Sequence, residues 1–272
     1  MTSSPTPKRA LFGIAIDALT LDQAVVAAWR IIADGRPGGC PYVVTPNVAH
    51  VVMLQKDRRF RQAYRGASLV LADGQPLIGV ARLVGRPLPE RIAGSDFVPA
   101  VLGAMAPDGL SLFLLGAGPG VAERAAQNIV RRYPGVRIAG CYSPPFGFEQ
   151  DPDENRRIVA RINAARPQLL VIGLGAPKQE LWISRHAAEL RVGLAVCAGA
   201  TIDFLAGHKA RAPRWIQNLS LEWLYRMACE PRRLSGRYIG DALRFPMIVG
   251  REIWHHRRHR EPAHRHRPSG RF

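Results

Sequence analysis

The stretch "VIGLGAPKQELW", Val171 to Trp182, shows the pattern that decides the fold. An apolar run ends at two glycines, and a segment with the apolar spacing of a helix follows directly. Units of this kind recur along the chain, and their alternation is typical of parallel strands joined by helices. The sequence therefore predicts an α/β fold, a Rossmann-like, mainly parallel sheet with flanking helices and a basic helical C-terminal appendage.

The other expected strands and helices follow the same rhythm. The strand-like runs are "YVVT" (42–45), "SLVLADG" (68–74), "LSLFLLG" (110–116), "VRIAGCY" (136–142), "QLLVIGLG" (168–175) and "GLAVCAGA" (193–200). The helix-like runs are "TLDQAVVAAWRIIADG" (20–35), "VAERAAQNIVRRY" (121–133), "DENRRIVARINAAR" (153–166) and "KQELWISRHAAEL" (178–190). In the first helix Thr20 is expected as the N-cap, Gln23 as its capping-box partner and Gly35 as the terminator.

Beyond Gly207 the chain contains no strand-like run. It predicts short helices, broken at Pro213, Pro231 and Pro246, with Ser220 as an N-cap and with arginine on the polar face. The tail rich in His and Arg is expected to be disordered. The predicted organisation is an α/β core at 1–207, a basic amphipathic helical appendage at 208–254 and a disordered basic tail at 255–272.

The charge of the chain is strongly basic and uneven. Thirty-eight Lys and Arg against 21 Asp and Glu give a formal net charge of +17, and the 64 residues from Lys209 onward carry +10 of it. Such a segment attracts a polyanion, which means nucleic acid, anionic lipid or a pyrophosphate group. The arginines alternate with aromatic residues and no DNA-reading helix is evident, which disfavours a nucleic-acid-binding protein as the main function.

The cysteines and the apolar runs indicate the compartment. Four cysteines form no C-x-x-C pair, which is typical of a reducing environment. The first residues lack the apolar core of a signal peptide, and no run reaches the roughly 18 apolar residues of a membrane span. A cytoplasmic protein without a membrane-crossing helix is therefore expected.

Polar residues at the predicted carboxyl ends of the strands mark the expected ligand site. Asp73 ends a buried strand and could accept a proton from a substrate hydroxyl, although an Asp-Gly pair is also a common turn. The glycines of "GAGPG" (116–120) would suit NAD, but the following strand region, "VRIAGCYSPP", lacks the carboxylate that would hold a ribose. A Rossmann oxidoreductase remains an alternative.

The turn "GLGAPKQE" (173–180) is the other candidate cradle. Its helix start and Lys178 would suit a diphosphate, and Gln179 could bind a hydroxyl or a base. Lys178 and Glu180 could equally well be the solvated start of a helix. The "DPD" at 151–153 resembles a metal-binding D-x-D, but a helix N-cap is favoured, and the histidines lack the spacing of a zinc site. No metal site is predicted.

Taken together, several motifs in one order are distinctive. These are "TPNVAHV", "LADGQPL", "ERIAGSDF", "FLLGAGPGVAERAA", "RYPGVRIAG", "GLGAPKQELWI", "GATIDFLAGHKARAPRW" and "LEWLYRMACEPRR". With them the chain resembles the WecG/TagA/CpsF glycosyltransferases, glycosyltransferase family 26, over residues 11–238. The resemblance implies an inverting, metal-independent enzyme of bacterial surface-polysaccharide synthesis. It would move a sugar from a UDP-sugar to a sugar on undecaprenyl diphosphate at the inner face of the cytoplasmic membrane.

The resemblance also implies roles for individual residues. Asp73 matches the proposed catalytic base, Thr45 and Asn47 match the sugar pocket, and Arg91 matches an arginine that meets a diphosphate. Gln179 matches the glutamine of the PKQE motif. The donor is left open among UDP-N-acetylmannosamine, its uronic acid and UDP-glucose, as are the acceptor sugar and a homo-oligomeric state.

The basic C-terminal segment matches an appendage that folds over the active site at the membrane. Arg226 and Arg233 fall on two of its arginine positions, and the third falls on Gly236, one residue before Arg237. These arginines, Arg91 and Lys178 could supply positive charge to a departing UDP without a metal. Basic residues and Trp also favour an anionic membrane surface.

Overall fold

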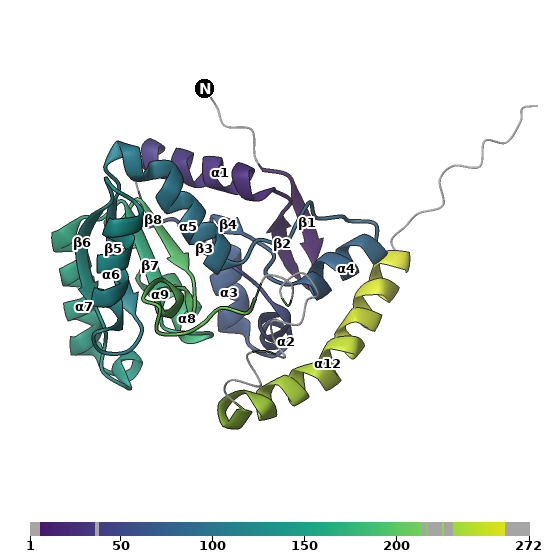
Figure 1. Cartoon of the computed structure of the whole chain (residues 1–272). Helices are drawn as coiled ribbons and strands as arrows, with labels where there is room; N and C mark the ends of the chain where they lie inside the picture. Colours follow the sequence, from purple (N-terminus) through teal and green to yellow (C-terminus); the bar gives the residue numbers. More distant parts are fainter. Residues whose placement is uncertain (1–5, 36–37, 214–215, 217–224, 226–230, 259–272) are drawn as a thin grey trace, which may run out of the picture.

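The computed structural model describes residues 6–35, 38–213, 216, 225 and 231–258, with the backbone alone at 231–239. A central sheet is covered by helices on both faces, and a long C-terminal helix lies against one side (Figure 1). The predicted α/β class, with a mainly parallel sheet and a helical C-terminal segment, is confirmed.

The main sheet has six parallel strands in the order β4-β3-β8-β7-β5-β6. They are β3 (Tyr42–Val44), β4 (Leu69–Val70), β5 (Ser111–Gly116), β6 (Arg137–Tyr142), β7 (Leu169–Gly173) and β8 (Leu194–Cys197). The central strands are buried on both faces, so their side chains are apolar without alternation. In β7, Leu169 and Val171 enter one core cluster, and Leu170 and Ile172 enter the other.

Helices form the two outer layers because each has one apolar face toward the sheet. One face is covered by α1 (Leu21–Asp34), α5 (Gly94–Met105), α6 (Val121–Arg132) and α9 (Thr201–Leu205). The opposite core cluster includes residues of α2 (Val48–Lys56), α3 (Arg58–Gly66), α4 (Gln75–Leu83), α7 (Pro152–Ala165) and α8 (Lys178–His186). Short 3-10 turns lie at Ala106–Asp108 and Phe148–Gln150. The predicted capping box of α1 is present, with Thr20 and Gln23 bonded reciprocally and Gly35 at the C-cap.

A hairpin that the sequence analysis did not anticipate covers the β4 edge of the sheet. It consists of β1 (Lys8–Leu11) and β2 (Ile14–Asp17), which pair antiparallel. The buried Asp17 carboxylate accepts a hydrogen bond from the Val70 backbone N–H at 2.8 Å. This contact satisfies a donor on the edge strand, which would otherwise be open to pairing with another chain.

The C-terminal segment corrects one prediction. Helix α12 (Pro231–Arg258) runs straight through Pro246, where a break was expected. A proline inside a helix costs about 3 kcal/mol. Phe245, Ile248, Val249 and Ile253 pack on the core and are half-buried. Full burial of one such side chain contributes about 1.5–3 kcal/mol, so four half-buried side chains together are enough to offset that cost. Residues 226–230 lie outside the described residues, so the break expected at Pro231 stays a prediction.

Helix α12 also extends past the predicted start of the disordered tail. Residues 255–258 are helical, and His256 contacts Glu252 one turn earlier at 3.0 Å. Residues 259–272 and the predicted cap Ser220 lie outside the described residues, and the domain boundaries stay predictions. In the part of the chain that the structure describes, no helix is both long enough and apolar enough to cross a bilayer.

Candidate active site

The carboxyl ends of all six parallel strands meet at one edge of the sheet, where open α/β sheets bind their ligands. Thr45 follows β3 at this edge, and Asp73 follows β4. Backbone hydrogen bonds from Leu71 to Val44 (3.0 Å) and from Asp73 to Pro46 (2.8 Å) continue the pairing beyond the two strands. Asp73 is therefore held beside the turn that follows β3.

Asp73 and Arg91 form an ion pair at this edge. Arg91 Nη1 lies 3.6 Å from Asp73 Oδ1, and the two side chains are 18% and 29% exposed. The Ile92 backbone N–H donates to the carbonyl of Ala72 at 2.8 Å and so fixes the Arg91 segment along the Asp73 segment. The residues predicted as base and as diphosphate partner are thus brought together, within reach of solvent and of a ligand.

Two further charged residues extend this pair. Arg91 Nη2 donates to Asp96 Oδ2 at 3.1 Å, and Arg211 donates to both oxygens of Asp96 at 2.6 and 2.8 Å. Sequence reasoning missed both Asp96 and Arg211. Both lie inside motifs of the family resemblance, "ERIAGSDF" and "GHKARAPRW", but nothing in the sequence indicated that the two residues meet.

Thr45 and Asn47 occupy the turn between β3 and α2. Thr45 is buried, at 6% exposure. Asn47 is the N-cap of α2, and its Oδ1 accepts a hydrogen bond from the His50 backbone N–H at 3.2 Å. Their predicted place in a sugar pocket stays a prediction, and the cap accounts for one polar atom of Asn47.

Behind this turn, two buried side chains not considered in the sequence analysis form a polar contact. His50 Nδ1 lies 2.6 Å from the Tyr64 hydroxyl. Burial raises the pKa of Tyr64 well above its ordinary value, and the charges of Glu180, Cys197 and Asp73 add to this rise. The Tyr64 hydroxyl therefore stays protonated and lies within the electrostatic influence of the predicted base.

The PKQE motif supplies a side chain that stabilises the protein. Gln179 is 3% exposed; its Oε1 accepts from the Gly199 backbone N–H at 3.1 Å, and its Nε2 donates to Glu180 Oε1 at 2.7 Å. Gln179 thus connects the start of α8 to the loop after β8. Its predicted contact with substrate stays a prediction.

Lys178, the residue before Gln179, pairs with a residue of the 3-10 turn Phe148–Gln150. Its Nζ lies 2.5 Å from Glu149 Oε1 and 5.0 Å from the centre of the Phe146 ring. The Lys178 side chain is 38% exposed, so it could also contact an anion. Its predicted role at a diphosphate is not tested by these contacts.

The "GAGPG" turn has a structural explanation. A Cβ at Gly116 would lie 2.6 Å from the backbone of Gly173, and the Ala117 backbone N–H donates to the Gly173 carbonyl at 3.1 Å. Ser143 Oγ closes the turn by donating to the carbonyls of Gly116 and Gly118, both at 3.2 Å. The glycine is required where β5 and β7 approach closely, whether or not a pyrophosphate binds.

The "DPD" motif is a helix cap, as favoured by the sequence. Asp151 Oδ1 accepts from the backbone N–H groups of Asp153 at 2.9 Å and of Glu154 at 3.1 Å. Among the residues that the structure describes, no group of three or more His, Cys, Asp or Glu is arranged to hold a metal ion.

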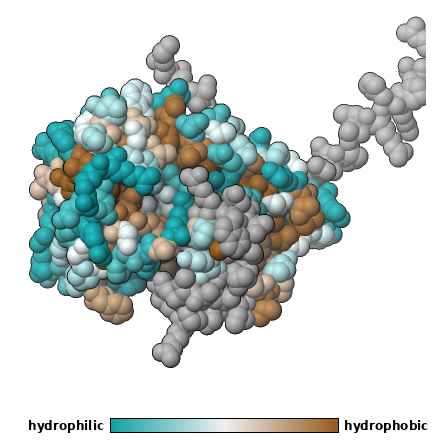
Figure 2. Space-filling model, viewed as in Figure 1, coloured by the Kyte–Doolittle hydropathy of each residue, from teal (hydrophilic) through white to brown (hydrophobic). Residues whose placement is uncertain are grey.

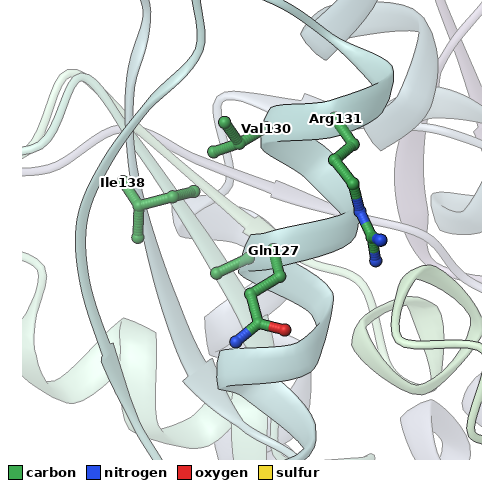
Figure 3. A pocket seen from close by; sticks show the side chains of 5 residues that line it. Gln127, Val130, Arg131 and Ile138 are labelled. Carbon is green, nitrogen blue, oxygen red and sulfur yellow. The ribbon is translucent and has the colours of Figure 1, made fainter.

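A separate hollow lies far along α6 from the strand ends (Figure 3). It is lined by Ala126, Gln127, Val130, Arg131 and Ile138. Because Ile138 belongs to the first half of β6, the hollow lies toward the amino ends of the strands, away from the carboxyl edge where Asp73 lies. We assign it no part in the candidate site.

Glu180 gives the site a pH-dependent stability. Its side chain is fully buried, its Oε2 has no hydrogen-bond partner within the described part of the chain, and burial raises its pKa to about 7. The folded protein thus keeps a proton that the unfolded chain releases near pH 4.5. The stabilising contribution is complete below pH 4.5 and is lost as the pH rises through 7.

Replacing Glu180 with Gln should remove this dependence. Between pH 4.5 and pH 8, the free energy of unfolding of the parent should fall relative to Glu180→Gln by about 3 kcal/mol. Denaturant titrations at several pH values measure it, with the exposed Glu123→Gln as the control that should follow the parent. Parallel curves for the parent and Glu180→Gln would show that the pKa of Glu180 is the same in the folded and unfolded chain.

Three predicted arginines cannot be placed. Arg226 lies outside the described residues, and Arg233 and Arg237 lie in α12 where the backbone alone is described. Their predicted contact with a diphosphate stays a prediction.

Comparison with known proteins gives a consistent result. A family model described as glycosyl transferase WecG/TagA/CpsF family matches residues 9–259. A curated protein from Bacillus spizizenii, named N-acetylglucosaminyldiphosphoundecaprenol N-acetyl-beta-D-mannosaminyltransferase, is 30% identical over 192 residues, covering 71% of this chain and 72% of the relative. Proteins of the same name from Staphylococcus aureus strains NCTC 8325 and COL are each 28% identical over 232 residues, covering 85% of this chain and 89% of the relatives.

Proposed function

The chain belongs to the glycosyl transferase WecG/TagA/CpsF family, and on this premise we propose that it moves a sugar from a UDP-sugar to a sugar on undecaprenyl diphosphate, with inversion. The names of the relatives give N-acetyl-β-D-mannosamine as the transferred group and N-acetylglucosaminyldiphosphoundecaprenol as the acceptor. UDP-N-acetylmannosamine is therefore the first donor to test, before its uronic acid and UDP-glucose. The Asp73–Arg91 pair at the carboxyl edge of the sheet is the observation that carries the proposal.

The proposed reaction uses the negative charge of Asp73 and the positive charge of Arg91. Asp73 takes the proton of the attacking acceptor hydroxyl, whose oxygen bonds to the anomeric carbon of the donor. On the opposite side of that carbon the bond to the UDP oxygen breaks, and UDP leaves with the electron pair. A single displacement of this kind inverts the anomeric configuration.

Positive charge near the departing diphosphate lowers the barrier because it acts where negative charge develops. Arg91 lies 3.6 Å from the proposed base and is only partly exposed, which strengthens its field. Lys178, Arg226, Arg233 and Arg237 are the further cations proposed for the donor or the lipid diphosphate. No metal is needed in this scheme.

The lipid-linked acceptor requires contact with a membrane, for which we propose the outer face of α12. Leu243, Met247 and Trp254 are 70%, 62% and 57% exposed, and their spacing places them on one face of the helix. Figure 2 shows hydrophobic surface at the lower right of the molecule, where Figure 1 places α12. Arg258 lies 3.8 Å from the centre of the Trp254 ring, and a Trp beside basic residues suits an anionic headgroup region. The inner face of the cytoplasmic membrane is the surface we propose.

The experiment is a transfer assay on the purified full-length protein. The three UDP-sugars are each combined with N-acetylglucosaminyl diphosphate lipid, UDP release is measured, and the anomeric configuration of the product is read by NMR. We expect one donor to release UDP in step with formation of an inverted product, with or without a chelator. A retained configuration, or loss of activity with the chelator, would reject that part of the mechanism.

Binding assays on the same purified protein distinguish the alternative functions. A Rossmann oxidoreductase would bind NAD in the absence of any sugar nucleotide, and a nucleic-acid-binding protein would bind arbitrary DNA with a steep dependence on salt. Failure of all three donors together with either of these results would overturn the proposed function.

A further inference from the structure

Asp73, Arg91, Asp96 and Arg211 form a continuous series of ion pairs, here called the charge quartet. The series runs from Asp73 to Arg91 (3.6 Å), from Arg91 to Asp96 (3.1 Å), and from Asp96 to Arg211 (2.6 Å). Its members come from three segments that are distant in sequence: the end of β4, the start of α5 with the residues before it, and the chain after α9. Two acids and two bases leave the quartet without net formal charge.

Asp96 is the member that organises the others. Its Oδ2 accepts from Nη2 of both Arg91 and Arg211, and its Oδ1 accepts from Nη1 of Arg211. A two-point contact between guanidinium and carboxylate fixes direction as well as distance. Asp96 itself is fixed because it lies in the first turn of α5, whose first residue, Gly94, is so close to the loop after β8 that a Cβ would lie 3.2 Å from Ala198 Cα.

Arg211 belongs to the short segment that leaves the core after α9. Backbone hydrogen bonds from His208 and Lys209 to the Asp203 carbonyl, at 2.9 and 3.3 Å, turn the chain at the end of α9, and Arg211 then reaches Asp96. Ala212 is buried at its end. Asp96 therefore binds one residue beside the predicted base and one residue near the start of the predicted appendage.

We propose that Asp96 is a positioning residue that directs Arg91 away from a closer pairing with Asp73 and ties residues 208–213 to the site. This inference rests on the proposed function, since it assigns Asp73 as the base. With Asp96 neutral, Arg91 would shift toward the carboxylate of Asp73, which lies 3.6 Å away. A closer guanidinium and the loss of a nearby negative charge would both lower the proton affinity of Asp73. Arg211 would lose its two-point partner at the same time.

The test compares Asp96→Asn with the parent in the transfer assay. We expect kcat/KM to fall by about 10- to 100-fold, since small displacements of a catalytic array cost about that much. The acid limb of its pH profile should move down by about one unit, the lower end of the effect of an arginine on a neighbouring Asp. Tyr64 and Glu180 also interact electrostatically in this region, but both are present in parent and variant. The difference between the two pH profiles therefore measures the effect of Asp96 on Asp73.

Two further variants provide a second test of the contact and a control. Arg211→Lys keeps the positive charge but loses the two-point contact of the guanidinium with Asp96. It should show part of the fall in kcat/KM, and the acid limb of its pH profile should move less than that of Asp96→Asn. Asp108→Asn, an exposed Asp beyond the opposite end of α5, is the control and should match the parent.

The outcomes separate the two proposals. An inactive parent would reject the proposed function. An active parent with an unchanged Asp96→Asn, or an Asp96→Asn loss of activity that leaves the acid limb in place, would reject the positioning role of Asp96 alone. If Asp96→Asn does not fold, full activity of Arg211→Lys would reject that role as well.

Discussion

Sugar transfer by the Asp73→Asn variant is expected to fall by about 10³-fold, with folding and donor binding retained, because general-base catalysis contributes about 10²- to 10⁴-fold. Asparagine has nearly the size of aspartate and can still hydrogen-bond, but it cannot accept the proton of the acceptor hydroxyl. The side chain is 29% exposed and its contact with Arg91 is 3.6 Å long, so little packing is lost.

Single-turnover transfer and equilibrium binding of the UDP-sugar measure the two effects separately. Asp153→Asn is the matched control because it neutralises an exposed carboxylate in the "DPD" motif, where a metal was considered. It should transfer sugar as the parent does. Substantial turnover by Asp73→Asn would remove Asp73 as the base, and loss of transfer in Asp153→Asn would return attention to a metal.

The main sheet was predictable because its signal is local. A strand buried on both faces must be apolar along its length, and a helix start has a recognisable cap, so β7 and the Thr20 cap could be identified from a few residues each. The β1–β2 hairpin was missed because four-residue strands carry little periodicity. The break predicted at Pro246 was wrong for a different reason: the packing of α12 on the core outweighs the tendency of proline to end a helix.

The candidate site was only half predictable. Asp73 could be proposed from its place after a strand, and Arg91 from the family resemblance, because each depends on a short motif. The partnership of Asp96 with Arg211 joins residues 115 positions apart, and it arises only once α5 and the chain after α9 are folded against the same edge. Gln179 shows the converse: a motif residue predicted to meet substrate is 3% exposed and has both ends of its amide bonded within the protein.

Removing the exposed apolar face of α12 should separate membrane binding from chemistry. The triple variant Leu243→Ser, Met247→Ser, Trp254→Ser is expected to bind vesicles containing anionic lipid about 100-fold more weakly. This assumes a loss of about 3 kcal/mol for three side chains that are partly inserted, about half of what full burial would give. The side chains are 70%, 62% and 57% exposed, whereas Phe245 and Ile248 hold the helix to the core, so the fold should persist.

Vesicle sedimentation measures the binding. The matched control replaces three exposed apolar residues elsewhere, Val26, Leu83 and Val130, with Ser. The α12 variant should lose transfer to acceptor embedded in vesicles but keep transfer to a short-chain, water-soluble acceptor, since Asp73 and its partners are untouched. Equal weakening by the control set would mean that general surface hydrophobicity attracts the protein to lipid. Undiminished vesicle binding by the α12 variant would leave the arginines as the remaining basis for docking, because charge alone would then bring the enzyme to its acceptor.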